Sequence, residues 1–236
     1  MKILICSLLR DSAGILNSWR QNLSYILDGS EEHEFYLSIF ENDSGDDTKN
    51  LISSADYSSF KEVKISLNNF GHQKFGCVSC EERVKNLAFY RNKSLRLYDY
   101  ALDFDYFLFL ESDIKIDKDT FKKLLKSAIE HDSDIISPLS WQVSLNHFYD
   151  AWGTRFRPGD HGLISFDFLP QNGEIKKAQS TFNCFCLYKP YIEEPFGWFS
   201  EEFQTFDCDT SVICEKYRKM GKDKIFVDSN LKIFHP

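Results

Sequence analysis

The first 140 residues alternate between short apolar runs and segments of helical periodicity, and this pattern restricts the possible folds more than any other feature. The apolar runs have the length of strands and are rich in β-branched and aromatic residues. Strands that alternate with helices build a mostly parallel sheet with helices on both faces. We therefore predict an α/β fold in one domain, with strands at residues 2–9, 34–40, 61–67 and 106–110 and helices at 15–26 and 81–100.

The remainder of the chain, residues 141–236, is less regular. Periodicity is lost over residues 141–174, where glycine and proline recur. Further strands are predicted at 134–139, 182–188, 225–227 and 231–234, and further helices begin near residue 119 and at residue 206, the latter ending at 220. We expect this half to be built onto the same sheet.

Composition excludes several classes of protein. The formal net charge of -8 argues against a nucleic-acid-binding surface, although it permits nucleotide binding when a metal ion neutralises a diphosphate. The apolar N-terminal run is too short for a bilayer and is interrupted by Arg10 and Asp11, so we interpret it as a strand. Seven cysteines without a framework spacing predict reduced thiols and a cytoplasmic setting.

Charged clusters follow three of the predicted strands, at residues 10–11, 41–47 and 111–113. The carboxyl ends of parallel strands lie at one edge of a sheet, so we expect these clusters to converge on one crevice. Glu111 and Asp113 are hard oxygen ligands, suited to a divalent cation that carries a phosphate group. The alternative is a polar surface turn, since turns favour Asp and Ser.

Arg91 lies on the apolar stripe of the helix predicted at residues 81–100. A buried arginine is costly unless it meets an anion. It either pairs with a structural carboxylate or contacts the phosphates of a ligand, for which its guanidinium fork is well suited.

These segments together resemble the nucleotide-sugar glycosyltransferases of the GT-A fold, a Rossmann-like arrangement. ENDSGDDT resembles the loop that holds base and ribose, LAFYRNKSL the Ala-Arg-Asn helix, and FLFLESD stands at the Asp-any-Asp metal motif. GWFSEEFQTFDCDTSVICEKYRKMG resembles the segment that supplies the catalytic carboxylate, and NLKIFHP the late strand whose histidine completes the metal shell. The resemblance spans nearly the whole chain and is closest to fungal capsule-associated and mannan-type mannosyltransferases.

The resemblance implies a role for each matching residue. Asp207 is the expected catalytic base, with Glu201, Glu202 and Asp209 as acidic alternatives around it. Asp113 and His235 are expected to hold Mn²⁺ or Mg²⁺. The residues expected to bind the nucleotide sugar are Arg10, Glu41, Asn42, Asp46, Arg91, Glu111 and Asp113. The chain departs from the family pattern at Glu111, where Asp is usual, and at Phe206, where Glu precedes the catalytic Asp.

The predicted function is metal-dependent transfer of a sugar from a nucleoside-diphosphate donor to a hydroxyl of a glycan or glycolipid. GDP-mannose is the first donor candidate and a UDP-sugar the second. The sequence is compatible with either inversion or retention of the configuration at the transferred sugar. Residues 1–140 are expected to bind the donor and residues 141–236 the acceptor, with peripheral membrane contact an option. One alternative is a sugar-phosphate nucleotidyltransferase, but these enzymes need a glycine-rich phosphate loop after the first strand, and the segment SLLRDSAG lacks that glycine pattern. The other alternative is a catalytically inactive carbohydrate-binding relative, which the presence of Glu111 in place of Asp favours.

Two further patterns leave alternatives open. The Cys77–Cys80 and Cys184–Cys186 pairs suit either a zinc site or, for the second pair, ordinary core positions on a strand. The tryptophans of the irregular half either stack on sugars or belong to the core; they are Trp141, Trp152 and Trp198.

Overall fold

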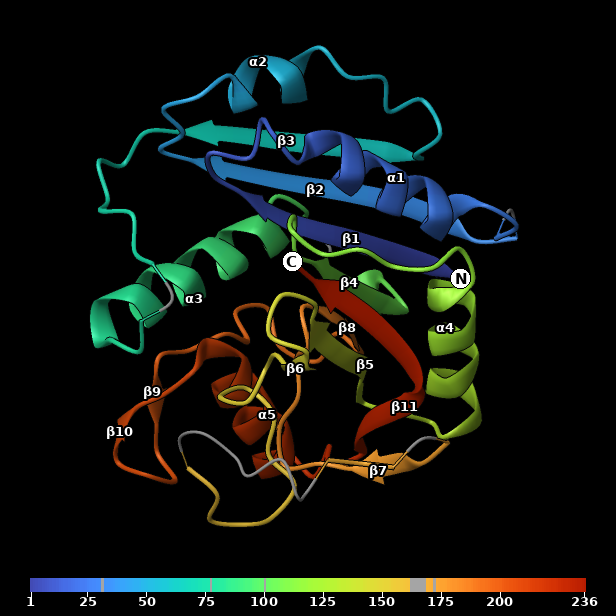
Figure 1. Cartoon of the computed structure of the whole chain (residues 1–236), viewed down its shortest axis with the longest axis vertical. Helices are drawn as coiled ribbons and strands as arrows, with labels where there is room; N and C mark the ends of the chain where they lie inside the picture. Colours follow the sequence, from blue (N-terminus) through green and yellow to red (C-terminus); the bar gives the residue numbers. More distant parts are fainter. Residues whose placement is uncertain (31, 77, 100, 162–168, 172) are drawn as a thin grey trace.

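The computed structural model describes residues 1–30, 32–76, 78–99, 101–161, 169–171 and 173–236. A large mixed sheet of strand order β3-β2-β1-β4-β8-β5-β11-β7 forms its centre, and β6 pairs with β5 (Figure 1). The parallel part contains β1 (Lys2–Leu9), β2 (Glu34–Asn42), β3 (Glu62–Asn68) and β4 (Tyr106–Leu110). This arrangement confirms the predicted α/β fold.

The second half of the chain completes the sheet. β5 (Ile135–Gln142) and β11 (Ile225–His235) run parallel to each other, and β8 (Phe185–Tyr188) lies antiparallel between β4 and β5. The short strands β6 (His147–Phe148) and β7 (Ile175–Lys177) pair antiparallel with β5 and β11. A separate small hairpin joins β9 (Phe199–Ser200) and β10 (Thr205–Phe206).

Helices cover both faces of the sheet. Ser7 of β1 accepts a hydrogen bond from Trp19 Nε1 in α1 (Leu16–Leu27), so its side chain faces that helix. Cys6 points the other way, in register with Ser38, which hydrogen-bonds Ser94 of α3 (Glu81–Leu95). α4 (Thr120–Glu130) packs beside α1, and α5 (Asp209–Lys219) beside α3. The short α2 (Thr48–Ser53) follows β2, and a single 3₁₀ turn covers Ala101–Asp103.

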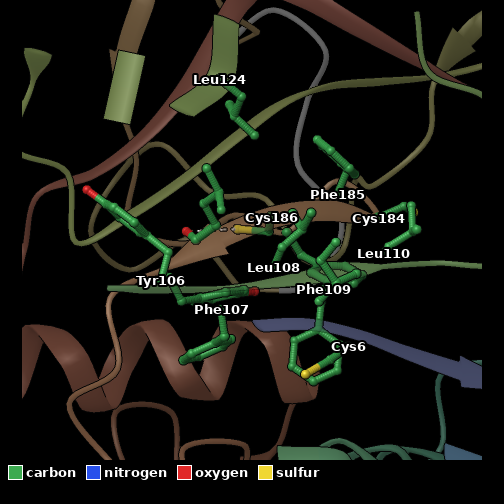
Figure 2. Close-up of a cluster of buried hydrophobic side chains, with 14 of the residues drawn as sticks. Cys6, Tyr106, Phe107, Leu108, Phe109, Leu110, Leu124, Cys184, Phe185 and Cys186 are labelled. Atoms are coloured by element: carbon green, nitrogen blue, oxygen red, sulfur yellow. Dashed lines mark hydrogen bonds between the residues drawn. The ribbon is translucent and has the colours of Figure 1, made fainter. Parts of the chain in front are cut away.

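The core is centred on β4, which is buried along its whole length because helices and neighbouring strands cover both faces. Phe107 stacks on Tyr188 with ring centroids 4.8 Å apart, and Phe109 meets Phe196 edge-on at 5.0 Å. Figure 2 shows part of this cluster, in which side chains of β4 meet those of β8 and β1. Each large side chain buried here stabilises the fold by about 1.5–3 kcal/mol.

Three differences from the prediction concern the position or number of elements near the site and the C-terminus. α3 ends at Leu95 rather than near residue 100, and α5 begins at Asp209 because Thr205–Phe206 pair with β9. The two predicted C-terminal strands are one strand, β11, interrupted by a bulge. Asp228 pairs with Pro138 and Lys232 with Leu139, so residues 229–231 have no partner on β5.

Candidate functional site

The carboxyl ends of the parallel strands open into two adjoining pockets. The first pocket, of about 230 Å³, lies at the ends of β1 and β2 and includes Arg10, Asn42 and Tyr90. The second pocket, of about 470 Å³, includes Asp113, Asp150 and His235. Both are lined by Arg83, Leu87 and Glu111. The expected crevice at this edge of the sheet is therefore present, and it has two compartments.

Arg91 connects two carboxylates in the second pocket. Its Nε donates to Asp209 Oδ2 at 2.6 Å and its Nη2 to Glu111 Oε1 at 2.7 Å. The residue is 4% exposed. Burial acts to lower the pKa of Arg91, but the two carboxylates raise it above the ordinary value. The structure therefore realises the carboxylate pairing that the sequence left open. Nη1 is buried and has no hydrogen-bond partner among the described residues.

Asp113 and His235 meet in the same pocket, although 122 residues separate them in the sequence. His235 Nε2 lies 3.2 Å from Asp113 Oδ2, and the imidazole stacks on Tyr149 with centroids 3.7 Å apart. Burial acts to lower the pKa of His235, but its hydrogen bond with Asp113 raises it overall.

Asp113 and His235 are candidate ligands of a divalent cation. In the described parts of the chain, no group of three or more His, Cys, Asp or Glu side chains is placed to hold a metal ion. Mg²⁺ commonly takes only one or two carboxylates from the protein, with substrate phosphates and water as its other ligands. One carboxylate and one imidazole therefore fit a cation that arrives with a diphosphate.

Asp207 lies outside both pockets. It is 1% exposed and forms a two-pronged ion pair with Arg155, beside a cavity of about 10 Å³. His161 is the nearest other ionisable partner, with Nε2 4.0 Å from Asp207 Oδ1. The structure thus separates Asp207 from Asp113, Arg91 and His235, while Asp209, two residues later, lines the second pocket.

The predicted donor-binding residues at the ends of β1 and β2 divide into two groups. Arg10 and Asn42 line the first pocket, and Arg10 Nη2 donates to His72 O at 2.8 Å. Glu41 is buried and accepts from Ser44 N at 2.8 Å. Asp46 accepts from Ala13 N and Thr48 N, each at 3.0 Å. Glu41 and Asp46 therefore shape the loop that carries the first pocket and do not line it.

Several residues of the second pocket were not predicted from the sequence. Asp150 accepts from Asn183 N at 2.8 Å, and burial raises the pKa of its carboxyl to about 6. Asn183 and Cys184 both have left-handed φ angles, 50° and 61°, which non-glycine residues seldom adopt. Glu111 N donates to Cys184 O at 3.0 Å, so this turn also positions the acidic segment after β4. The lack of periodicity around Asp150 gave no signal for these contacts.

The tryptophans and cysteines have different environments. Trp152 lines the second pocket, whereas Lys85 lies over Trp198 and Lys232 over Trp141. Cys184 also lines the second pocket, and Cys186 Sγ contacts Ile136 O in the core. Cys77, one of the four cysteines of the zinc-site alternative, lies outside the described residues.

The family comparison decides the relationship of the chain. The family model described as Cryptococcal mannosyltransferase 1 matches residues 2–204. The chain belongs to this family. Membership confirms the predicted relationship to capsule-associated mannosyltransferases. No curated protein sequence matches the chain.

Solved structures support the same fold. S. aureus TarS, residues 1–349 in complex with UDP, superposes with a TM-score of 0.60 at 16% identity, covering 99% of this chain and 60% of TarS 1–349. GalNAc-T7 with UDP, GalNAc and Mn²⁺ gives 0.58 at 10% identity, covering 100% of this chain and 43% of GalNAc-T7. A197 from STIV gives a TM-score of 0.50 at 14% identity, and the match covers 100% of this chain and 86% of A197. The chain thus has the GT-A fold and spans about 60% of TarS 1–349. Among the described residues, no helix combines the length and apolar character needed to cross a bilayer.

Proposed function

We propose that this protein transfers a sugar from a nucleoside-diphosphate donor to a hydroxyl of a glycan or glycolipid, with Mn²⁺ or Mg²⁺ bound. The observation that carries the proposal is the pair of adjoining pockets at the carboxyl edge of the sheet, with Asp113 and His235 in the second. A nucleotide sugar needs such an arrangement, since its base, diphosphate and sugar occupy successive positions. Mannose from GDP-mannose is the first donor to test because of the family to which the chain belongs.

In this proposal the donor lies across both pockets. Base and ribose occupy the first pocket beside Arg10 and Asn42, with Glu41 and Asp46 holding the loop behind them. The diphosphate passes Glu111 toward Asp113, in the pocket that Arg91 also lines. The complexes of TarS with UDP and UDP-GlcNAc, and of GalNAc-T7 with UDP and Mn²⁺, support a donor of this class.

The proposed chemistry depends on stabilising the leaving diphosphate. A divalent cation held by Asp113 and His235 would neutralise the negative charge that develops there. Arg91 keeps Glu111 and Asp209 fixed around the reacting centre. Leu87 and Phe182 add apolar walls that limit water near the sugar.

An inverting transfer also requires a carboxylate that accepts the proton of the attacking hydroxyl. Asp207 is the candidate from the sequence, and its ion pair with Arg155 has to open for that role. Asp150 is the second candidate: it lines the second pocket and has no ion-pair partner among the described residues. A retaining transfer needs neither, and each residue then has a positioning role.

The acceptor is proposed to enter from the half formed by residues 141–236, while residues 1–140 hold the donor. Trp152 supplies an aromatic face in the second pocket on which a sugar ring can stack. If the acceptor is a glycolipid, the protein meets it at a membrane surface.

The test is a panel of GDP- and UDP-sugars incubated with the protein and Mn²⁺, followed by measurement of released nucleoside diphosphate. We expect release from at least one donor, loss of release in EDTA, and loss in Asp113→Asn. A nucleotidyltransferase would instead release pyrophosphate from a nucleoside triphosphate and a sugar phosphate. The absence of both turnover and metal-dependent nucleotide binding with every donor of the panel would contradict the proposal and favour an inactive sugar-binding relative.

A further inference from the structure

Arg83 stands at the boundary between the two pockets. It lies on α3 four residues before Leu87 and eight before Arg91, so the three side chains follow one side of the helix. Arg83, Leu87 and Glu111 line both pockets, whereas Arg91 lines the second. A ligand that extends from one pocket into the other therefore passes beside Arg83.

Arg83 differs from the other cations of this region because its guanidinium is free. Arg91 is paired with Glu111 and Asp209, Arg10 donates to the His72 carbonyl, and Lys74 is bound to Asp11 at 2.6 Å. Within the described residues, Arg83 has neither a hydrogen-bond nor an ion-pair partner, and its side chain is half-buried. It is therefore a cation of the cleft whose donors no group in the described parts of the chain occupies.

The second pocket carries more negative than positive side chains, so the positive charge of Arg83 matters for binding an anion there. The described lining residues of this pocket include four carboxylates, and the guanidiniums among them are those of Arg83 and Arg91; the carboxylates are Glu111, Asp113, Asp150 and Asp209. Because Arg91 is already shared between two of them, the pocket opposes an incoming diphosphate unless further positive charge faces it. A free guanidinium can donate two parallel hydrogen bonds to phosphate oxygens.

We propose that Arg83 binds the diphosphate at the passage between the pockets, independently of the metal, and thereby makes the site select nucleoside diphosphates over monophosphates. This inference rests on the donor orientation given under the proposed function. A monophosphate attached to a base in the first pocket ends before the passage, whereas the second phosphate reaches it. The selection is therefore expected to depend on Arg83 and to persist in a chelator.

The experiment is calorimetric titration of the purified protein in EDTA with GDP, GMP, UDP and UMP. We expect the wild type to bind the diphosphate of its preferred base at least tenfold more tightly than the monophosphate. In Arg83→Gln the diphosphate affinity falls about tenfold while the monophosphate affinity stays within twofold, so most of the preference disappears. Arg83→Lys keeps the positive charge without the forked guanidinium, and it is expected to recover part of the preference for the diphosphate.

The matched control is Arg96→Gln, at the other end of α3, where Arg96 pairs with the exposed Glu194 outside both pockets. It is expected to bind both nucleotides as the wild type does. Arg83→Gln should also unfold at the wild-type temperature, since no described partner loses a contact.

The outcomes separate this inference from the proposed function. An Arg83→Gln variant that retains the diphosphate preference overturns the role of Arg83, even if the wild type transfers sugar. The same holds if the wild type shows no preference in EDTA. An Arg83-dependent preference in a protein that turns over no donor supports the inference and overturns the proposed function instead.

Discussion

Arg155 holds Asp207 from two sides: Nη1 lies 2.7 Å from Oδ2 and Nη2 lies 2.5 Å from Oδ1, and both side chains are almost completely buried. Asp207 Oδ1 also accepts from Cys208 N at 2.7 Å, directly before α5 begins. The pair joins the irregular region after β6 to the start of α5. Because of this geometry, we expect Asp207 to contribute measurably to the free energy of unfolding, whether or not it also contributes to catalysis.

Replacing Asp207 by Asn is expected to lower the free energy of unfolding by about 3–5 kcal/mol, because the buried guanidinium of Arg155 loses its counter-charge. Urea denaturation measures this, with Asp160→Asn as the control, since its partner Arg157 is exposed. The double variant Asp207→Leu with Arg155→Met should recover part of the loss. If Asp207→Asn instead unfolds like the wild type and only loses turnover, Asp207 is the base that the sequence predicts.

Asp113→Asn is expected to reduce the affinity for Mn²⁺ at least tenfold in the presence of a nucleoside diphosphate, because it removes the one carboxylate of the proposed site. Glu111→Gln should change Mn²⁺ affinity much less, since Arg91 already engages Glu111. Electron paramagnetic resonance of free Mn²⁺ measures both. Equal losses in the two variants would show that Glu111 is also a metal ligand.

Much of the fold follows from local patterns, whereas the pairings at the site do not. The continuous apolar runs Lys2–Leu9 and Tyr106–Leu110 were predicted with their observed limits, because a strand buried on both faces has a simple composition. The convergence of Asp113, Arg91 and His235 was expected from the carboxyl ends of parallel strands and from the family resemblance, and all three line the second pocket. The partners of Arg91 could not be predicted, since Asp209 lies 118 residues away and no local pattern links them. The left-handed turn at Asn183 and Cys184 carries no glycine that would signal it.

Trp152→Ala is expected to raise the KM for the acceptor about tenfold, with little change in the KM for the donor, because the aromatic face in the second pocket is lost. Initial rates at varied acceptor and donor concentrations measure this. Trp198→Ala is the control, since Lys85 lies over its ring at 4.1 Å and it lines neither described pocket. Comparable acceptor effects in both variants would argue against Trp152 as an acceptor contact.

The stability of the fold should depend on the ionisation of Asp150. Burial raises the pKa of this carboxyl to about 6, so between about pH 4 and pH 6 the folded protein holds a proton that the unfolded chain has released. The free energy of unfolding therefore falls as pH rises through this window, with a contribution of about 3 kcal/mol from Asp150. Urea denaturation from pH 4 to 7 should show a shallower decline in Asp150→Asn; parallel curves would contradict this assignment.

The bulge in β11 has a consequence for how this fold tolerates changes in chain length. Residues 229–231 are three residues of β11 that have no partners on β5. Side chains of a strand alternate between its two faces, so an odd number of inserted residues changes the face that later side chains reach. Residues 229–231 therefore invert the alternation that Ile225 and Val227 begin, and with it the side of the sheet on which His235 lies. Loss or gain of one residue here would turn the imidazole to the opposite side of the sheet, whereas a change of two would preserve its orientation. Among related chains, length variation between Asp228 and Lys232 should accordingly occur in steps of two.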